Sequence, residues 1–238
     1  MQPEFLARLS EPVQQFIRDV ERDAGIEIIV CLDPRQNDGG TTGQGKLAVV
    51  INAQRVLLFA PTNGYFPDGG VRHEALHVQR FHVQGVPKLC LADSEDWDKG
   101  FSDALGGLDN AIEHVVIVPV ELQFHPDRRD HWEAVMHAVC LGLPEVPEFE
   151  RGLAVCLHWT FLQHALPGSP SLEVARRFAQ EHGLLQMAEE FANRFIAVAH
   201  SKEEVVRLIF DTFPDIPKSR AALEYINCMT GTVQRPIP

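Results

Sequence analysis

The sequence lacks the cysteine pattern of a disulfide framework or of a thiolate zinc site. Its 238 residues contain five cysteines that lie far apart, and no two of them form a C-x-x-C pair. Scattered cysteines in an odd number are typical of buried free thiols in a reducing compartment. We therefore expect free thiols at all five positions, which are Cys31, Cys90, Cys140, Cys156 and Cys228.

Long apolar runs and an excess of positive charge are also missing. No run approaches the roughly 18–20 apolar residues that a membrane helix needs, and no basic segment followed by an apolar one opens the chain. The formal net charge of -12 argues against nucleic-acid binding, whose affinity comes largely from neutralising phosphates. We expect a cytoplasmic protein with neither a membrane nor a nucleic-acid partner.

The front half of the chain combines amphipathic helices with short apolar strands. Helical spacing of apolar residues, with Ser10 as a candidate N-cap, predicts the first helix. Runs rich in valine, isoleucine and leucine predict strands, the last two of which are close enough to form a hairpin. The predicted elements are a helix at 11–24, strands at 26–32, 46–52 and 55–61, a helix from about 70 to 84 with Asp68 as its candidate cap, a loop at 90–99 and a helix from 101 to about 118.

The rear half is predicted to consist of helices that proline and glycine separate. Its candidate helices are 130–141, 148–166, 171–182, 184–200, 202–213 and 218–229. The sequence therefore predicts an α+β fold, with a small sheet and a helix at about 70–84 followed by an all-helical C-terminal lobe. The predicted division places a core at residues 1–125 and the helical lobe at residues 126–238, whether as two domains or as one.

One short motif in the predicted helix at 70–84 carries chemistry. His73-Glu74-Ala75-Leu76-His77 places two histidines at i and i+4, where both imidazoles lie on one face of a helix. Glu74 is rotated by about 100° from His73, which suits contact with a metal-bound water better than ligation. Chance produces H-E-x-x-H about once in twenty-five chains of this composition. The interpretation therefore depends on the surrounding elements as well as on the motif.

The order of elements around this motif resembles that of the zincin superfamily of metallopeptidases, and most closely its small gluzincin-like members. The resemblance covers residues 1 to about 125, and its only sharp motif is His73-Glu74-x-x-His77. It implies that His73 and His77 bind Zn²⁺ and that Glu74 is the general base. It also implies that a strand near residues 46–60 lies at the edge of the sheet and binds an extended peptide or protein substrate.

The third metal ligand is expected on the next helix, within Gly106 to Pro119. On a helical wheel Glu113 lies about 120° from the apolar stripe and His114 about 140° on the other side, so geometry leaves both open. The resemblance favours Glu113, although Ile117 stands where such proteins often place an acidic residue. We predict His73, His77 and Glu113 as ligands, with His114 as the alternative third ligand and Asp109 as a residue that orients the ligand.

The remaining assignments stay open. A zinc peptidase needs a donor for the oxyanion, and Tyr65, Tyr225 and His131 are all candidates. The predicted function is a zinc-dependent hydrolase, and specifically a peptidase. The first alternative is a non-catalytic binding or regulatory protein whose metal is structural or absent. A second alternative is a zinc hydrolase of non-peptide amides, because the motif specifies water activation and not the bond that is cleaved.

Overall fold

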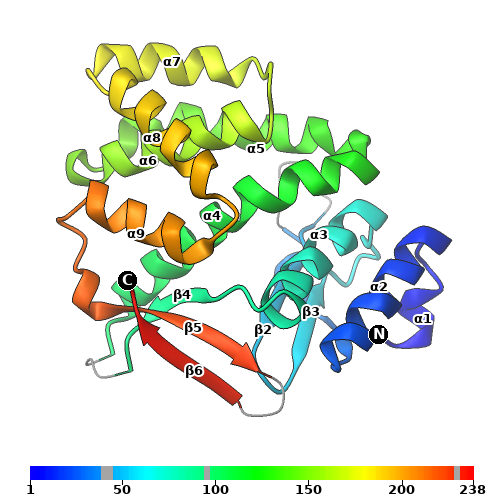
Figure 1. Cartoon of the computed structure of the whole chain (residues 1–238). Coiled ribbons are helices and arrows are strands. Elements are labelled where there is room, and N and C mark those ends of the chain that lie inside the picture. The colour runs from blue at the N-terminus through cyan, green and yellow to red at the C-terminus, as the bar shows by residue number, and fades with distance from the viewer. Residues whose placement is uncertain (39–44, 94–96, 228–230) are drawn as a thin grey trace. The chain divides into compact units, whose positions relative to one another are not determined.

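The computed structural model describes residues 1–38, 45–93, 97–227 and 231–238 (Figure 1). The chain forms two compact units. Unit 1 comprises Met1–Lys88 and Glu224–Val233, and unit 2 comprises Leu89–Leu223 and Gln234–Pro238. The predicted division at residue 125, into a zincin-like core and a helical lobe, stays a prediction.

Unit 1 contains the predicted strands and the helix with the histidine motif. Each predicted element of residues 1–84 is present, with ends that differ by a few residues. In chain order the elements are α1 (Pro3–Leu6), α2 (Glu11–Ala24), β1 (Ile28–Leu32), β2 (Ala48–Ile51), β3 (Val56–Ala60), α3 (Asp68–Val78) and a π-helical turn, η2 (Gln79–Val83).

The sheet of unit 1 has the strand order β1-β3-β2. β1 runs parallel to β3 and β2 antiparallel to it, with Val56 opposite both Ile28 and Ile51. β2 and β3 form the predicted hairpin, in which the Asn52 amide donates to the Arg55 carbonyl. The Asn52 side chain also accepts from the amides of Gln54 and Arg55, which stabilises this tight turn.

Side chains occupy the outer edge of β1. The Gln2 amide group donates to the Val30 carbonyl and accepts from the Val30 amide, as a neighbouring strand would. The Glu21 carboxylate accepts from the Ile28 amide at 2.8 Å. These bonds satisfy the backbone groups of an edge strand and block pairing with another chain. β2 forms the other edge of the sheet.

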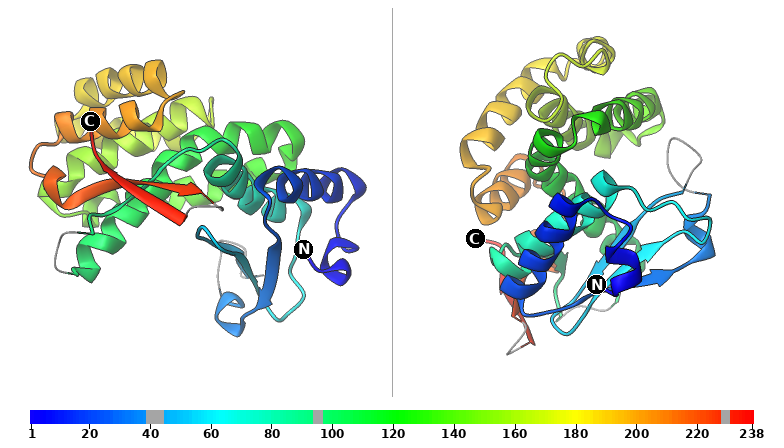
Figure 2. Two further views of the ribbon diagram at one scale, coloured as in Figure 1. Left: turned by 60° about the horizontal axis from the view of Figure 1, so that its bottom comes forward. Right: turned by 90° about the vertical axis from the view of Figure 1, so that its right-hand side faces the viewer.

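α2 and α3 pack against each other and belong to one apolar core with the sheet (Figure 2). The predicted apolar face of α2 is buried at Val13, Ile17 and Val20. Burial of each such side chain contributes about 1.5–3 kcal/mol. Phe16 lies at the margin of this face. The guanidinium carbon of Arg72 on α3 lies 4.1 Å from the centre of the Phe16 ring. The helix with the histidine motif is therefore anchored along its length.

Unit 2 is built mainly from helices. The predicted helices between residues 130 and 213 are present, again with ends that differ by a few residues. The helix predicted at 101–118 is longer than expected, because it continues through Pro119 to Phe124. The helices are α4 (Lys99–Phe124), α5 (Arg129–Gly142), α6 (Glu148–His164), α7 (Ser171–Glu181), α8 (Leu185–Val198) and α9 (Lys202–Thr212).

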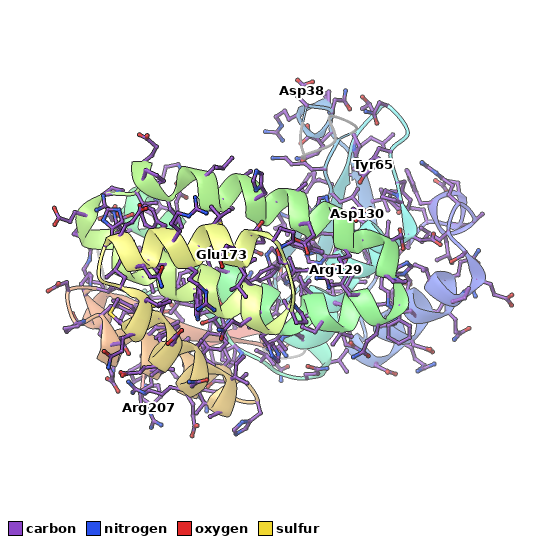
Figure 3. The ribbon with its side chains drawn as sticks, turned by 90° about the horizontal axis from the view of Figure 1, so that it is seen from above. Asp38, Tyr65, Arg129, Asp130, Glu173 and Arg207 are labelled. Atoms are coloured by element: carbon purple, nitrogen blue, oxygen red, sulfur yellow. The ribbon has the colours of Figure 1, made fainter. Side chains whose placement is uncertain are left out.

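Polar contacts and a buried core hold these helices together. Arg129, at the start of α5, donates to the Pro167 carbonyl and to Glu133, which fixes the segment that precedes α7 (Figure 3). α6 packs against α4, α5, α7 and α8, and its Trp159 is fully buried. α6 is therefore the central helix of this unit.

The prediction of an all-helical C-terminal lobe is wrong. Residues 218–229, predicted as a helix, instead include β5 (Ala221–Asn227), and β6 (Gly231–Pro236) follows it. These strands form a second sheet of order β4-β5-β6, in which β4 (Lys88–Leu91) includes residues predicted as loop. Pairing with β4, more than a hundred residues earlier, overrides the helical propensity of this alanine- and leucine-containing segment. The fold class itself, α+β, is as predicted.

Four of the five predicted free thiols are confirmed, at Cys31, Cys90, Cys140 and Cys156. Burial raises the pKa of the Cys140 thiol to about 11 and that of Cys156 to about 12, so both are protonated at neutral pH. The prediction for Cys228 lies outside the described residues. Within the described part of the chain, no helix is both long and apolar enough to cross a membrane.

A histidine in α6 makes stability depend on pH. Burial lowers the pKa of His158 to about 4, because its charged form is poorly solvated there. The folded state therefore binds fewer protons than the unfolded state between pH 6.5 and 4. This contribution to stability is complete above pH 6.5 and is lost as the pH falls toward 4. The free energy of unfolding falls between pH 7 and pH 4.5 in the wild type. We expect this fall to be smaller in His158→Gln, by up to about 2 kcal/mol.

Urea unfolding of the wild type and of His158→Gln at pH 7, 5.5 and 4.5 measures this difference. The matched control is His137→Gln, at an exposed histidine of α5, which should follow the wild type. Equal pH dependence of His158→Gln and the wild type would contradict the assignment.

Candidate metal centre

Two imidazoles lie next to each other on α3. The ring centroids of His73 and His77 are 5.1 Å apart, with the rings edge to face at 83°. Each residue is only 6% exposed. A residue and its i+4 neighbour share one helix face, so this spacing lets both imidazoles turn a nitrogen toward one metal ion. The pair is suited to a borderline metal such as zinc, which prefers nitrogen and sulfur ligands.

The start of α3 is held by a contact that differs from the predicted cap. Pro67 is the N-cap residue, and it makes no side-chain hydrogen bond to the helix. Asp68 is the first helical residue, and its carboxylate accepts from the Ser10 amide at 3.1 Å and 3.3 Å. The prediction that Asp68 caps α3 is therefore wrong. Its negative charge still favours the helix N-terminus, and its hydrogen bond ties α3 to the start of α2.

Glu74 lies on the side of α3 that faces the core of unit 1. It follows Val71 by three residues and precedes Val78 by four, which places all three on one face. It lines a small pocket with apolar side chains that include Ile17, Ile28 and Leu58, and with Met1, whose N-terminal ammonium group binds Glu21. Glu74 is partly buried, and its apolar neighbours limit the access of bulk water. A positioned carboxylate in such surroundings is typical of a general base.

Glu113 and Asp109, the predicted ligand and its orienting residue, both bind Lys202. The two carboxylates stand one turn apart on α4, and the Lys202 ammonium group lies 2.7 Å from Glu113 and 2.8 Å from Asp109. Asp109 also accepts from the Leu89 amide at 2.7 Å. Glu113 is fully buried, and the Lys202 side chain is 1% exposed. Glu113 therefore serves as the counter-ion of a buried ammonium group.

His114, the predicted alternative ligand, lies on a different side of α4 and is partly buried. Its ring meets the Trp132 ring of α5 edge to face, with centroids 5.1 Å apart. The Trp132 indole nitrogen donates to Glu121 at 3.0 Å, and the Arg128 guanidinium binds the same carboxylate at 2.8 Å. Trp132 is therefore fixed at both its ring and its nitrogen, and it gives His114 a rigid neighbour.

The predicted oxyanion donors occupy three different settings. The ring of His131 also meets that of Trp132 edge to face, with centroids 5.4 Å apart. Tyr65 is partly buried in the turn before α3. Tyr225 is on strand β5 and not on the predicted C-terminal helix, which corrects its expected setting. Within unit 2, the contacts bring His131 and His114 to the same tryptophan.

Comparison with known proteins identifies no relative. No family model, no curated protein and no solved structure matches the chain.

Three residues that shape this region carried no signal in the sequence. Lys202 begins a helix 89 residues after Glu113, and nothing local indicates that it is buried. Trp132 follows the candidate oxyanion donor His131 directly, and its contact with His114 joins two different helices. Phe81 is an apolar residue four positions after His77, and the stacking of its ring on His77 depends on the π-helical turn. The role of each of these residues depends on a contact with a distant residue or with another ring, which local sequence patterns do not show.

The Lys202 ion pairs predict a large loss of stability on mutation. Lys202→Met leaves two buried carboxylates without their counter-ion, so we expect the free energy of unfolding to fall by about 3–5 kcal/mol. Chemical denaturation at pH 7 measures the change. Lys99→Met is the matched control, because its side chain is 78% exposed in an ion pair with Asp103 and should cost less than about 1 kcal/mol. A loss for Lys202→Met no larger than that of the control would contradict this role.

Proposed function

We propose that the protein is a zinc-dependent hydrolase that cleaves peptide bonds, with His73, His77 and His114 as its metal ligands. The observation that carries the proposal is the pair of buried imidazoles one turn apart on α3, with the Glu74 carboxylate on the adjacent face. A later helix of the chain carries further residues that can bind a metal. Metal binding therefore explains two buried histidines at this spacing better than packing in an apolar core does.

The choice of His114 in place of Glu113 follows from the contacts of unit 2. Glu113 is fully buried and paired with Lys202, and withdrawing it to bind a metal would leave a buried ammonium group with one carboxylate fewer. The ring of His114 meets Trp132 edge to face, which supports it in one orientation. We therefore reverse the preference for Glu113 that the family resemblance suggested, and Asp109 becomes part of the Lys202 ion-pair network.

The donor set suits zinc with an open position. Three imidazole nitrogens are typical of catalytic zinc sites, which keep the fourth position for water. Zinc bound in this way lowers the pKa of its water to about 7 and polarises the carbonyl of a substrate.

Glu74 is the residue proposed to move the proton. Its carboxylate accepts a proton from the attacking water and then donates it to the leaving amine. Glu74 is partly buried and lines one pocket with the apolar residues Ile17, Ile28 and Leu58. Glu74 lies about 100° around the helix from His73, so this role does not compete with metal binding by the histidines.

β2 is the strand proposed to bind an extended peptide. Asn52 and Arg55 are a hydrogen-bonded pair of the hairpin, so the backbone groups of Val49 and Ile51, at alternate positions, point away from β3. The Ile51 carbonyl accepts from the Lys88 ammonium group at 3.1 Å, so a peptide would pair with this edge at Val49. A peptide that pairs with this edge gains main-chain hydrogen bonds that are independent of its sequence. The other edge of the sheet is occupied by Gln2 and Glu21. The unit 1 sheet therefore offers β2 as its peptide-binding edge.

Metal content tests the proposed ligands. We expect about one zinc per chain in the purified wild type. His73→Ala, His77→Ala and His114→Ala should each lose most of it, because two remaining imidazoles bind zinc weakly. Elemental analysis after gel filtration measures the ratio, with His137→Ala, at an exposed histidine, as the control that retains zinc. Unchanged zinc in all three ligand variants would contradict the site, whereas loss in Glu113→Gln and retention in His114→Ala would restore Glu113 as the ligand.

Substitution of Glu74 separates metal binding from catalysis. Glu74→Gln should retain its zinc and lose about 10²- to 10⁴-fold in the rate of hydrolysis, because an amide cannot accept the proton. Digestion of a mixed peptide library followed by mass spectrometry measures cleavage. Glu173→Gln, on the exposed face of α7 (Figure 3), is the control that keeps its activity. Full activity in Glu74→Gln would contradict the proposed base, and a zinc-loaded wild type that cleaves nothing would favour the non-catalytic alternative.

A further inference from the structure

The helix with the two histidines ends in a π-helical turn. α3 passes directly into η2, and the Gln84 amide donates to the Gln79 carbonyl at 2.9 Å, five residues earlier. Such turns are rare, and they often occur where a helix has to direct particular side chains at a functional site. The contacts made by the side chains of η2 therefore bear on the function of the neighbouring histidines.

Phe81, in the middle of η2, stacks on His77. The ring centroids are 6.2 Å apart and the planes are only 18° from parallel. Phe81 is 3% exposed, so its ring is confined by the unit 1 core. His73 meets His77 edge to face, as described above. The His77 imidazole is thus flanked by the ring of a second histidine and by the face of a phenylalanine.

Two neighbours hold this stack to the end of β2. The Lys88 ammonium group lies 5.5 Å from the centre of the Phe81 ring and donates to the Ile51 carbonyl at 3.1 Å. A cation over an aromatic ring is attracted to it. His82, the next residue after Phe81, places a ring nitrogen 3.1 Å from the Asn52 carbonyl. Phe81 can therefore not shift without disturbing contacts to the edge strand.

We propose that Phe81 is a positioning residue that fixes the orientation of the His77 imidazole for metal binding. The inference rests on the proposed metal site and adds a residue that does not itself touch the metal. A ligand ring that is already held in one orientation loses less conformational freedom on binding. Residues that orient metal ligands commonly change metal affinity by 10- to 100-fold when they are altered.

The zinc dissociation constant of folded variants tests this role. Phe81→Leu keeps an apolar side chain and removes the ring face, and we expect about a 10-fold or larger increase in the Kd for Zn²⁺, measured by competition with a chromophoric chelator. Phe66→Leu is the matched control. Phe66 is buried in the same core at 8% exposure and contacts Phe5 instead of a histidine. Its Kd should equal that of the wild type, although both variants lose stability.

The visible spectrum of the Co²⁺-substituted protein provides a second readout, because it reports ligand geometry and not stability. Phe81→Leu should alter the band shape, and Phe66→Leu should not. If Phe81→Leu does not fold, Phe81→Met, which fills the space with a flexible chain, takes its place. Tight zinc binding in the wild type with an unchanged Kd and spectrum in the Phe81 variant overturns this inference alone. Absence of zinc binding in the wild type overturns the proposed function and this inference with it.

Discussion

A buried ammonium group on α9 determines which residues of α4 are available for chemistry. Lys202 has almost no contact with solvent, and two carboxylates one turn apart on α4 compensate its charge. Because an uncompensated buried charge costs several kcal/mol, Asp109 and Glu113 are held in this ion-pair network. The network joins α9, α4 and, through the Leu89 amide, the start of β4. It also sets the rotation of α4, so that His114 contacts Trp132 of α5.

Neighbouring residues also fix the polar side chains of α3. Its first turn is tied to Ser10, and its arginine packs on Phe16. Its last histidine stacks on Phe81, and Phe81 packs under Lys88, which donates to Ile51 at the end of β2. Gln2 and the Glu21 side chain of α2 bond to the edge formed by β1, and Lys88 bonds to Ile51 at the β2 edge. The proposed metal-dependent peptidase would need rigid ligands, a partly buried carboxylate and a strand edge together.

Local patterns in the sequence predicted most of the elements but not their long-range partners. The apolar face of α2 and the β2–β3 hairpin carry their own signals, in the helical spacing from Val13 to Val20 and in the short turn at residues 53–54. Residues 221–227 have alanine, leucine and glutamate, which favour a helix, and only pairing with β4 makes them a strand. Local patterns left the choice between Glu113 and His114 open for a similar reason. Their angles on the helical wheel are nearly equal, and the residue that distinguishes them is Lys202, far along the chain.

The most direct test of the account is a crystal structure of the purified protein, with its metal identified by anomalous scattering at the zinc edge. The account predicts one zinc peak bonded to imidazole nitrogens of His73, His77 and His114 at about 2.0–2.1 Å, with a water at the fourth position. It also predicts that the Glu113 carboxylate remains on Lys202. A zinc ion bonded to Glu113, a site closed by four protein ligands, or no metal at these histidines would contradict it.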